Sequence, residues 1–482
     1  MRILAGLCCL IMVLGAASIA APQPIQRSTL ADQTGVEVTV YNQNMGLVKE
    51  TRKLNLPEGR GELRFTDVAA HIMPVTVHVE SLGDPKGFTI LEQNYEYDLI
   101  NATKLLDKYV GKKIKVIDWN RYHDRKEVVD AILLSNNKGQ IFKINGEIYL
   151  GYPGVRVLPE LPENLIAKPT LTWLFDNTGK NPRSLEVSYL TNNINWKADY
   201  VVVLNKDDSL ADISAWVTID NKSGATYKQA TLKLVAGEVQ RVKEHLPRRA
   251  LEMAAAPRAK ARGFQEQAFF EYHLYNLKRK TTIKDRQTKQ IRLLQAYNVK
   301  VQKEFIVQGI KSYFTRRYEV RKPKQPVDVY IKFKNSKENN LGMPLPTGIM
   351  RLYKEDQFRS QLFIGEDRID HTPRNEEVKL KIGQAFDVVA ERTQKSYQRL
   401  AKNLHESEWE VVVRNHKAEA VNVGIIEPLF GNWKVISSSQ PYKKINAFTI
   451  RFDVNVPKDG EVKVTYKVRG RDHITRRGTA VS

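Results

Sequence analysis

The sequence has very little cysteine. Among its 482 residues only Cys8 and Cys9 are cysteines, and both lie at the beginning of the chain. Disulfide frameworks and paired-cysteine metal motifs are therefore excluded for the rest of the chain, and its stability has to come from packing. A cysteine-free exported protein is ordinary for a bacterium, whereas small secreted eukaryotic modules depend on disulfides.

Long hydrophobic runs are confined to the N-terminus. Arg2 is followed by an apolar run from Ile3 to Ala17 and then by the small residues that precede Ala21. The run is shorter than the ~18 residues that span a membrane, so it predicts a secretory signal peptide, residues 1–20, rather than an anchor. Neither cysteine follows the small residue that a lipoprotein signal requires. We therefore expect a soluble periplasmic or secreted protein with no transmembrane segment in the mature chain.

Catalytic signatures are also missing. The sequence has no HExxH, GxSxG, P-loop, GxGxxG or CxxC motif, and its nine histidines are scattered. The first fragment that merits attention is Tyr122-His123-Asp124. A carboxylate pair for glycoside hydrolysis needs no proximity in sequence, but no pair stands out. We therefore predict no cofactor.

The second fragment is an acidic string, Glu366, Asp367, Asp370 and His371. Carboxylates and an imidazole that converge can bind a divalent cation. However, Pro373 and Asn375 continue the turn chemistry, which favours an acidic turn between two strands. We therefore predict no metal site here.

Positive charge is in excess and unevenly placed. The formal net charge is +22. Lys and Arg are concentrated in residues 241–262 and again in 278–303. Such density attracts acidic polymers, although basic side chains on strands often simply face water. The candidate ligand-binding residues are Lys278, Arg279, Lys280, Lys284, Arg286 and Lys289, which we expect on one hairpin.

The stretch from Leu185 to Gly237 predicts four consecutive β-strands. In the third of them, alternate residues from Ala211 to Ile219 are apolar and those between them, from Asp212 to Asp220, are mainly polar. This period of two puts one face of the strand on a core. Asn, Asp, Ser and Gly at 205–209 and 221–224 supply the turns.

The N-terminal region, residues 35–160, reads as β-rich with one helix. Short strands lie between Gly35 and Leu82, and helical spacing predicts a helix from Asp98 to Val110 that Asp98 caps and Gly111 ends. The short strands that follow, with a hairpin signal at Asn145-Gly146, favour a small barrel. The proline-spaced run 158–169 predicts a connection to the next domain.

The remaining sequence predicts two further domains. A central β-sandwich region spans 170–335 and contains a basic Ala/Arg/Pro loop at 244–263 that has no strand pattern. A C-terminal β-sandwich region spans 341–470 and ends in strands on both sides of the turn 457–460. The expected fold is mainly β and multi-domain, with Ig-like β-sandwich units, a small N-terminal barrel-like module and few helices.

Several segments resemble a known family. They include SYLTNNINWKADYVVVLN, DISAWVTIDNKSGATYKQATLKLVAGEV, TTIKDRQTKQIRLL, PLPTGIMRLYKED and FIGEDRIDHTP, in this order between Leu171 and Val468. They look like a bacterial family of exported proteins with a C-terminal domain of unknown function, mucoidy-inhibitor-like. Relatives often have a Pro-Ala-Gly type of turn where this chain has Lys284 to Gln287. The resemblance implies fold and compartment but no catalytic residues.

Aromatic residues offer one further possibility. Trp196, Tyr200 and Trp216 lie on neighbouring predicted strands, and with Trp173 and Trp409 they are compatible with a sugar-binding face. Packing against the core or a neighbouring loop is the alternative, and it is the commoner use of such aromatics.

Two function classes remain. One is a non-enzymatic envelope protein that binds or scaffolds an anionic glycan, lipid head groups or a protein partner, with no nucleic acid expected. The other is a periplasmic hydrolase acting on polysaccharide or peptide. The first is favoured because only the second requires catalytic residues that the sequence does not single out.

The N-terminal pattern gives a direct prediction. We expect export to remove residues 1–20, so that the mature chain begins at Ala21. Intact-mass spectrometry of the exported protein measures this, and a mature chain that still begins at Met1 would contradict it.

Overall fold

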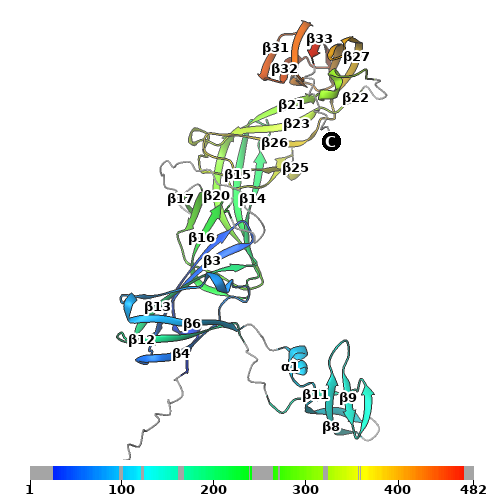
Figure 1. Ribbon diagram of the computed structural model, residues 1–482. Coiled ribbons are helices and arrows are strands. Elements are labelled where there is room, and N and C mark those ends of the chain that lie inside the picture. Colours follow the sequence, from blue (N-terminus) through cyan, green and yellow to red (C-terminus); the bar gives the residue numbers. More distant parts are fainter. Residues whose placement is uncertain are drawn as a thin grey trace, which may run out of the picture. The chain divides into compact units, whose positions relative to one another are not determined.

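The computed structural model describes residues 25–96, 101–120, 124–160, 168–237, 239–240, 264–269, 272–318, 324–356, 358 and 360–471. The fold is mainly β, as the sequence predicts (Figure 1). The predicted signal peptide, Tyr122, His123, most of the connection 158–169 and the whole basic loop 244–263 lie outside the described residues. In the described part, no helix is long and apolar enough to cross a membrane.

The chain divides into two compact units. Unit 1 comprises Met1–Val38, Leu47–Asn192 and Ser223–Ala230, and unit 2 comprises Thr39–Gly46, Asn193–Lys222 and Thr231–Ser482. Unit 1 contains a four-stranded sheet of order β1-β4-β12-β6. Its strands are β1 (Ile25–Ser28), β4 (Gly59–Thr66), β12 (Thr170–Asn177) and β6 (Phe88–Glu96). Trp173 is fully buried in this sheet, with its ring 5.1 Å from that of Phe65.

Unit 1 also contains a small module built on an open five-stranded sheet of order β10-β9-β8-β7-β11. Its strands are β7 (Lys113–Asn120), β8 (Arg125–Ser135), β9 (Ile141–Ile144), β10 (Glu147–Leu150) and β11 (Val155–Val157). The predicted barrel is therefore wrong: β10 and β11 are unpaired edges of an open sheet, and no closed barrel forms in the described residues.

One α-helix, α1 (Ala102–Lys108), occurs in the described part of the chain and covers one face of this small sheet. Leu106 and Tyr109 pack against Val116, Leu133 and Phe142. The helix begins later than predicted because Asn101 caps it, accepting the N–H of Lys104 at 2.9 Å.

A sheet of eight strands has the order β17-β18-β16-β2-β3-β13-β5, with β19 paired to β16. Its strands are β2 (Gln33–Tyr41), β3 (Met45–Leu54), β5 (His78–Leu82), β13 (Arg183–Asn192), β16 (Tyr227–Ala236), β17 (Phe264–Phe269), β18 (Tyr272–Leu277) and β19 (Thr281–Ile283). The residues of β2, β3 and β16 are divided between the two units.

Unit 2 contains a five-stranded sheet of order β20-β15-β14-β24-β25. Its strands are β14 (Ile194–Leu204), β15 (Leu210–Asn221), β20 (Gln287–Lys300), β24 (Gly348–Glu355) and β25 (Gln361–Ile369). The four strands predicted within 185–237 are thus all present, and from Ala211 to Ile219 the apolar residues are buried as predicted. Strands that are adjacent in sequence nevertheless separate, because β13 and β16 belong to one sheet, whereas β14 and β15 pair in another.

The remaining strands of unit 2 form a sandwich of two sheets. The six-stranded sheet contains β26 (Glu377–Gln384), β23 (Asp328–Lys334), β21 (Gln302–Gln308), β29 (Val421–Pro428), β32 (Thr449–Val456) and β31 (Tyr442–Asn446). The five-stranded sheet contains β22 (Lys324–Gln325), β27 (Val388–Ala401), β28 (Leu404–Asn415), β33 (Gly460–Arg471) and β30 (Asn432–Ser438). One apolar cluster joins both sheets, from Ile425 and Phe452 to Trp409 and Tyr466.

Pairings cross the predicted domain limit between 170–335 and 341–470. Strand β24 runs parallel to β14, and β26 pairs with β23. Whether the regions 35–160, 170–335 and 341–470 fold independently stays a prediction. Short 3-10 helices connect strands at η1 (Leu30–Asp32), η2 (Pro74–Thr76), η3 (Pro85–Gly87), η4 (Lys311–Phe314) and η5 (Lys337–Asn339).

A buried ion pair lies inside the sandwich. Arg392 on β27 donates to Glu427 on β29 at 2.5 Å and to the Tyr466 hydroxyl at 2.8 Å. Both charged side chains are almost fully buried, and the guanidinium also lies over the rings of Tyr313 and Trp409. Removing one partner therefore leaves a desolvated charge without compensation.

This pair yields a stability prediction. We expect Glu427→Ala to lower the free energy of unfolding by about 3–5 kcal/mol, and the double variant R392M/E427M to lose less, because it buries no lone charge. Urea unfolding measures both. Lys443→Ala, which breaks an exposed pair with Asp453, is the control and should cost at most about 1 kcal/mol. A double variant that loses more than Glu427→Ala would contradict the argument.

Candidate functional site

The six candidate cations lie at both ends of a very short strand. Lys278, Arg279 and Lys280 form the turn between β18 and β19, and Lys284 and Arg286 lie in the turn between β19 and β20. Lys289 lies on β20 opposite Ile219 of β15. Five of the six side chains are exposed and Lys289 is half-buried. We call this set the cationic turns.

The expected single hairpin is wrong. Strand β19 pairs with β16 and β20 pairs with β15, so the turn at 284–286 passes from one sheet to another. Along an extended strand of ~3.3 Å per residue, the Cα atoms of Lys280 and Lys284 are about 13 Å apart. Their charges therefore suit several groups along an extended anion better than one small ion.

The second turn is held firmly at its backbone. The side-chain amide of Asn221, which is fully buried, donates to the carbonyl of Lys284 at 3.0 Å. Gln287 accepts the N–H of Lys284 at 3.3 Å, and Arg286 adopts a left-handed conformation with φ of 52°. The backbone is fixed while the basic side chains project into solvent.

Within the described ranges, few ion pairs involve the cationic turns. In the described part of the chain, Arg286 pairs with Asp285 at 3.8 Å, and no carboxylate forms an ion pair with the other five. Elsewhere the cations of unit 2 are commonly paired, as in Arg414, which contacts both Glu391 and Glu461. Six cations against one carboxylate leave a strong local excess of positive charge.

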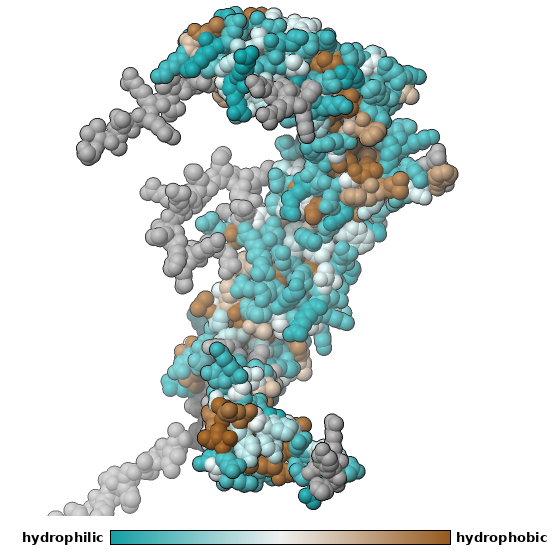
Figure 2. Space-filling view, turned by 90° about the vertical axis from the view of Figure 1, so that its right-hand side faces the viewer, coloured by the Kyte–Doolittle hydropathy of each residue, from teal (hydrophilic) through white to brown (hydrophobic). Residues whose placement is uncertain are grey.

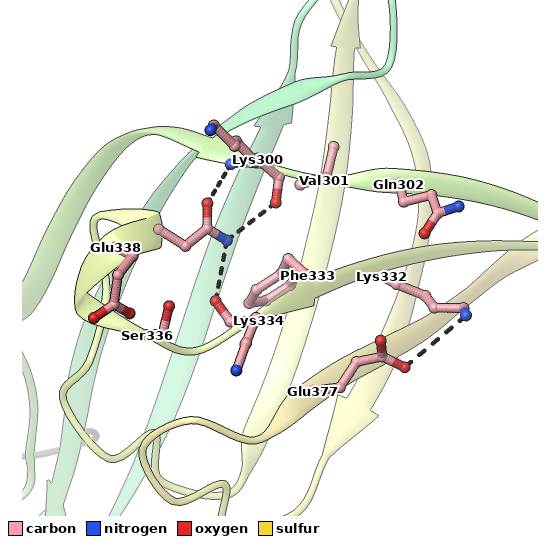
Figure 3. Close-up of a pocket in the computed structure, with 10 residues that line it drawn as sticks. Lys300, Val301, Gln302, Lys332, Phe333, Lys334, Ser336, Glu338 and Glu377 are labelled. Atoms are coloured by element: carbon pink, nitrogen blue, oxygen red, sulfur yellow. Dashed lines mark hydrogen bonds and ion pairs between the residues drawn. The ribbon is translucent and has the colours of Figure 1, made fainter.

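A groove of about 400 Å³ lies elsewhere in unit 2 (Figure 3). Its lining residues come from the end of β20, the beginning of β21, β23, η5 and the beginning of β26: Lys300, Val301, Gln302, Lys332, Phe333, Lys334, Ser336, Glu338, Asn339 and Glu377. No sequence pattern predicts this groove, since the segments that form its walls are far apart in sequence. The alternation of Lys332 and Lys334 with buried Phe333 on β23 was the only local signal.

Asn339 builds one wall of the groove. Its amide accepts the N–H of Lys300 at 2.7 Å and donates to the carbonyls of Lys300 and Lys334 at 3.1 and 3.0 Å. Figure 3 shows these bonds joining the two strand ends. The side chain of Asn339 therefore links two strands of the fold and is not available to bind a ligand through these hydrogen bonds.

Carboxylates balance most of the charge in the groove. Lys332 contacts Glu304 at 3.2 Å and Glu377 at 4.0 Å. The lining contains three lysines and two glutamates, Glu338 and Glu377, so its excess charge is small. The groove is therefore a weaker candidate for anion binding than the cationic turns.

Behind the groove, Glu304 on β21 holds three cations. Its carboxylate contacts Arg451 at 2.6 Å and both Lys332 and Lys379 at 3.2 Å. Burial alone would raise the pKa of Glu304, but these cations outweigh it and hold the pKa below the ordinary value of 4.5. The charge balance of the groove depends on this residue remaining ionised.

The acidic string does not converge. Glu366 pairs with Arg351 at 3.2 Å, and Asp367 accepts the backbone N–H of Lys381 at 2.7 Å. His371 accepts the N–H of Thr347 through Nδ1 and lies 3.4 Å from the amide of Asn42. Within the described ranges, no group of three or more His, Cys, Asp or Glu is placed to hold a metal ion. Of the other fragment, only Asp124 is described, and it accepts the indole N–H of Trp119.

The suggested aromatic sugar-binding face is wrong. Trp173, Trp196, Tyr200 and Trp409 are buried in cores, because these strands turn their aromatic side inward. The indole of Trp196 donates to the carbonyl of Val235, and the hydroxyl of Tyr200 to that of Pro346. Trp216 is half-buried, with the guanidinium of Arg292 5.3 Å from its ring.

The sequence matches a known protein family. A domain of unknown function, DUF4139, matches residues 185–430, just over half of the sequence. The chain belongs to the DUF4139 family. The match contains the cationic turns, the groove and the acidic string, and it confirms the domain of unknown function that the resemblance implied. No curated protein matches this DUF4139 protein.

Glu304 gives a prediction with a defined pH dependence. Glu304→Gln should lower the free energy of unfolding at pH 7 by about 1–3 kcal/mol, because three cations lose their carboxylate. The folded-state pKa is depressed, so this contribution is complete above the unfolded value of 4.5 and is lost as the pH falls through the lower folded value. Urea midpoints of both proteins measured from pH 7 to pH 3 test this. A stability gap that widens below pH 4.5 would contradict it.

Proposed function

We propose that this DUF4139 protein is a non-enzymatic binding protein of the bacterial cell envelope that recognises an anionic component through the cationic turns. The observation that carries the proposal is that five exposed or half-buried cations form no ion pair with the described residues, in a part of unit 2 where backbone positions are fixed. Charge that the protein does not neutralise itself is available to a ligand.

The spacing of the charges supports an extended ligand. The turns at the two ends of β19 are separated by more than one phosphate or carboxylate group can span. Anionic groups repeated along a glycan, or head groups side by side in a lipid surface, match this spacing. The signal peptide expected at residues 1–20 and the resemblance to mucoidy-inhibitor-like proteins support a periplasmic or secreted location.

A hydrolase has less support. Glu366, Asp367 and His371 of the acidic string make separate contacts, with Arg351, Lys381 and Thr347 respectively. The proposal therefore assigns no catalytic residue.

Charge reversal tests the proposal. In the variant K280E/K284E/R286E we expect retention on purified envelope fragments at low salt to fall roughly tenfold or more, and its salt sensitivity to disappear, because exposed charges act over roughly 8 Å at physiological ionic strength. Retention is measured on glycan and lipid fractions separately, which distinguishes the two sources of anionic groups.

The matched control reverses three exposed lysines elsewhere in unit 2, in the variant K402E/K434E/K458E. It changes net charge equally and should retain binding. Equal retention of the wild type and the cationic-turn variant would reject the proposal, and equal loss in both triple variants would reduce it to a non-specific effect of net charge.

A further inference from the structure

The small module in unit 1 has one face that no described helix or strand covers. Helix α1 covers the inner face of its sheet, where Val116, Leu133 and Phe142 are buried. The opposite face carries aliphatic side chains that are strongly exposed, with Leu150 at 85%, Val155 at 68% and Ile148 at 65%. We call this second surface the outer face. Part of the surface of the module is visible in Figure 2, with brown hydrophobic residues beside teal hydrophilic ones.

Strand register places these side chains in rows across the sheet. Val155 lies opposite Ile117, and Ile117 lies opposite Val128. Because side chains alternate between faces, residues paired in this way project on the same side. Leu150 lies opposite Ile141 at the other edge. Exposed apolar residues therefore extend from β11 to β10, and a contiguous patch of this kind usually marks a contact surface.

Lysines are interleaved with the aliphatic residues. Lys113, Ile132, Lys143 and Ile148 form one row over four strands. Lys115 and Lys126 lie on the same face, opposite Asp130 and Trp119 respectively. Four lysines and one aspartate make the outer face both apolar and positively charged.

We infer that the outer face binds the surface of an anionic lipid bilayer. Lysine stems pack along apolar groups while their ammonium ends reach anionic head groups, so the two side-chain types act together at a lipid interface. Trp119, 57% exposed at the edge of the face, is of the type enriched in that interface.

A protein partner fits this face less well. Lysine is depleted at the centre of protein interfaces, whereas Lys113, Lys115 and Lys143 lie among the aliphatic residues on β7 and β9 rather than at a rim. Binding hot spots in protein interfaces are rich in Tyr, Trp and Arg, and the exposed residues here are mainly Val, Ile and Leu. The inference concerns a surface separate from the cationic turns and does not rest on the proposed function.

Vesicle sedimentation of the full chain tests this inference. We expect binding to phosphatidylcholine vesicles that contain phosphatidylglycerol and little binding to phosphatidylcholine alone. The variant I148T/L150T/V155T, which places the strand-favouring residue threonine at all three positions, and the variant K113E/K143E should each lower the partition coefficient roughly tenfold or more.

The control is K53E/K86E, which reverses two exposed lysines of unit 1 outside the module and should bind as the wild type does. Each variant is first shown to keep the wild-type urea midpoint, so that loss of binding is not loss of fold. The inference would be overturned if the wild-type protein did not bind anionic vesicles, or if the module variants bound them as strongly as the wild type does.

A third arm separates the inference from the proposed function. The variant K280E/K284E/R286E should still sediment with anionic vesicles through the outer face. If that variant loses vesicle binding while the module variants keep it, the cationic turns are the lipid-binding surface and the outer face is not. If the module variants instead abolish self-association in light scattering, the outer face binds a second copy of the chain, and the lipid assignment is rejected.

Discussion

Alternation of buried and exposed side chains along long paired strands is the constraint on which the structure depends. Strand β13 alternates without interruption over ten residues, and β28 does so over twelve. Cysteine is confined to Cys8 and Cys9, so burial must provide the stability, at roughly 25 cal/mol per Å² of apolar surface. A slip of one residue would turn the partly exposed carboxylates of such a strand, Glu186 on β13 or Glu410 on β28, toward the core, and this penalty fixes the register.

Buried arginines add a second constraint in both units. In unit 1, Arg52 pairs with Glu50 and its guanidinium lies over the ring of Phe65. In unit 2, Arg392 pairs with Glu427 and its guanidinium lies over the ring of Trp409. Such pairs contribute little net stability compared with apolar residues of the same volume. Separating the partners is costly, however, so arrangements of strands that fail to bring them together are disfavoured.

The sequence predicted strands better than it predicted their partners. Period-two patterning gave the four strands of 185–237 and the final strands β32 and β33, because alternation depends on local burial. It did not predict that β32 and β33 belong to opposite sheets of the sandwich, or that β19 and β20 separate. Partner choice depends on contacts between distant segments. The groove was missed for the same reason, since Lys300 and Lys332 meet only after β20 and β23 are placed.

Local neutralisation, rather than basic composition, distinguishes the surfaces of this protein. The groove also contains basic residues, Lys300, Lys332 and Lys334. However, Lys332 forms ion pairs with Glu304 and Glu377, so the excess positive charge of the groove is small. Among the described residues, one carboxylate forms an ion pair with the six cations of the cationic turns, and one aspartate accompanies four lysines on the outer face of the small module. A ligand gains from cations that the protein leaves unpaired, because it then replaces no internal ion pair. The cationic turns offer charge on fixed polar turns, which suits a hydrated polyanion, whereas the outer face places its lysines among exposed aliphatic side chains, which suits a lipid surface.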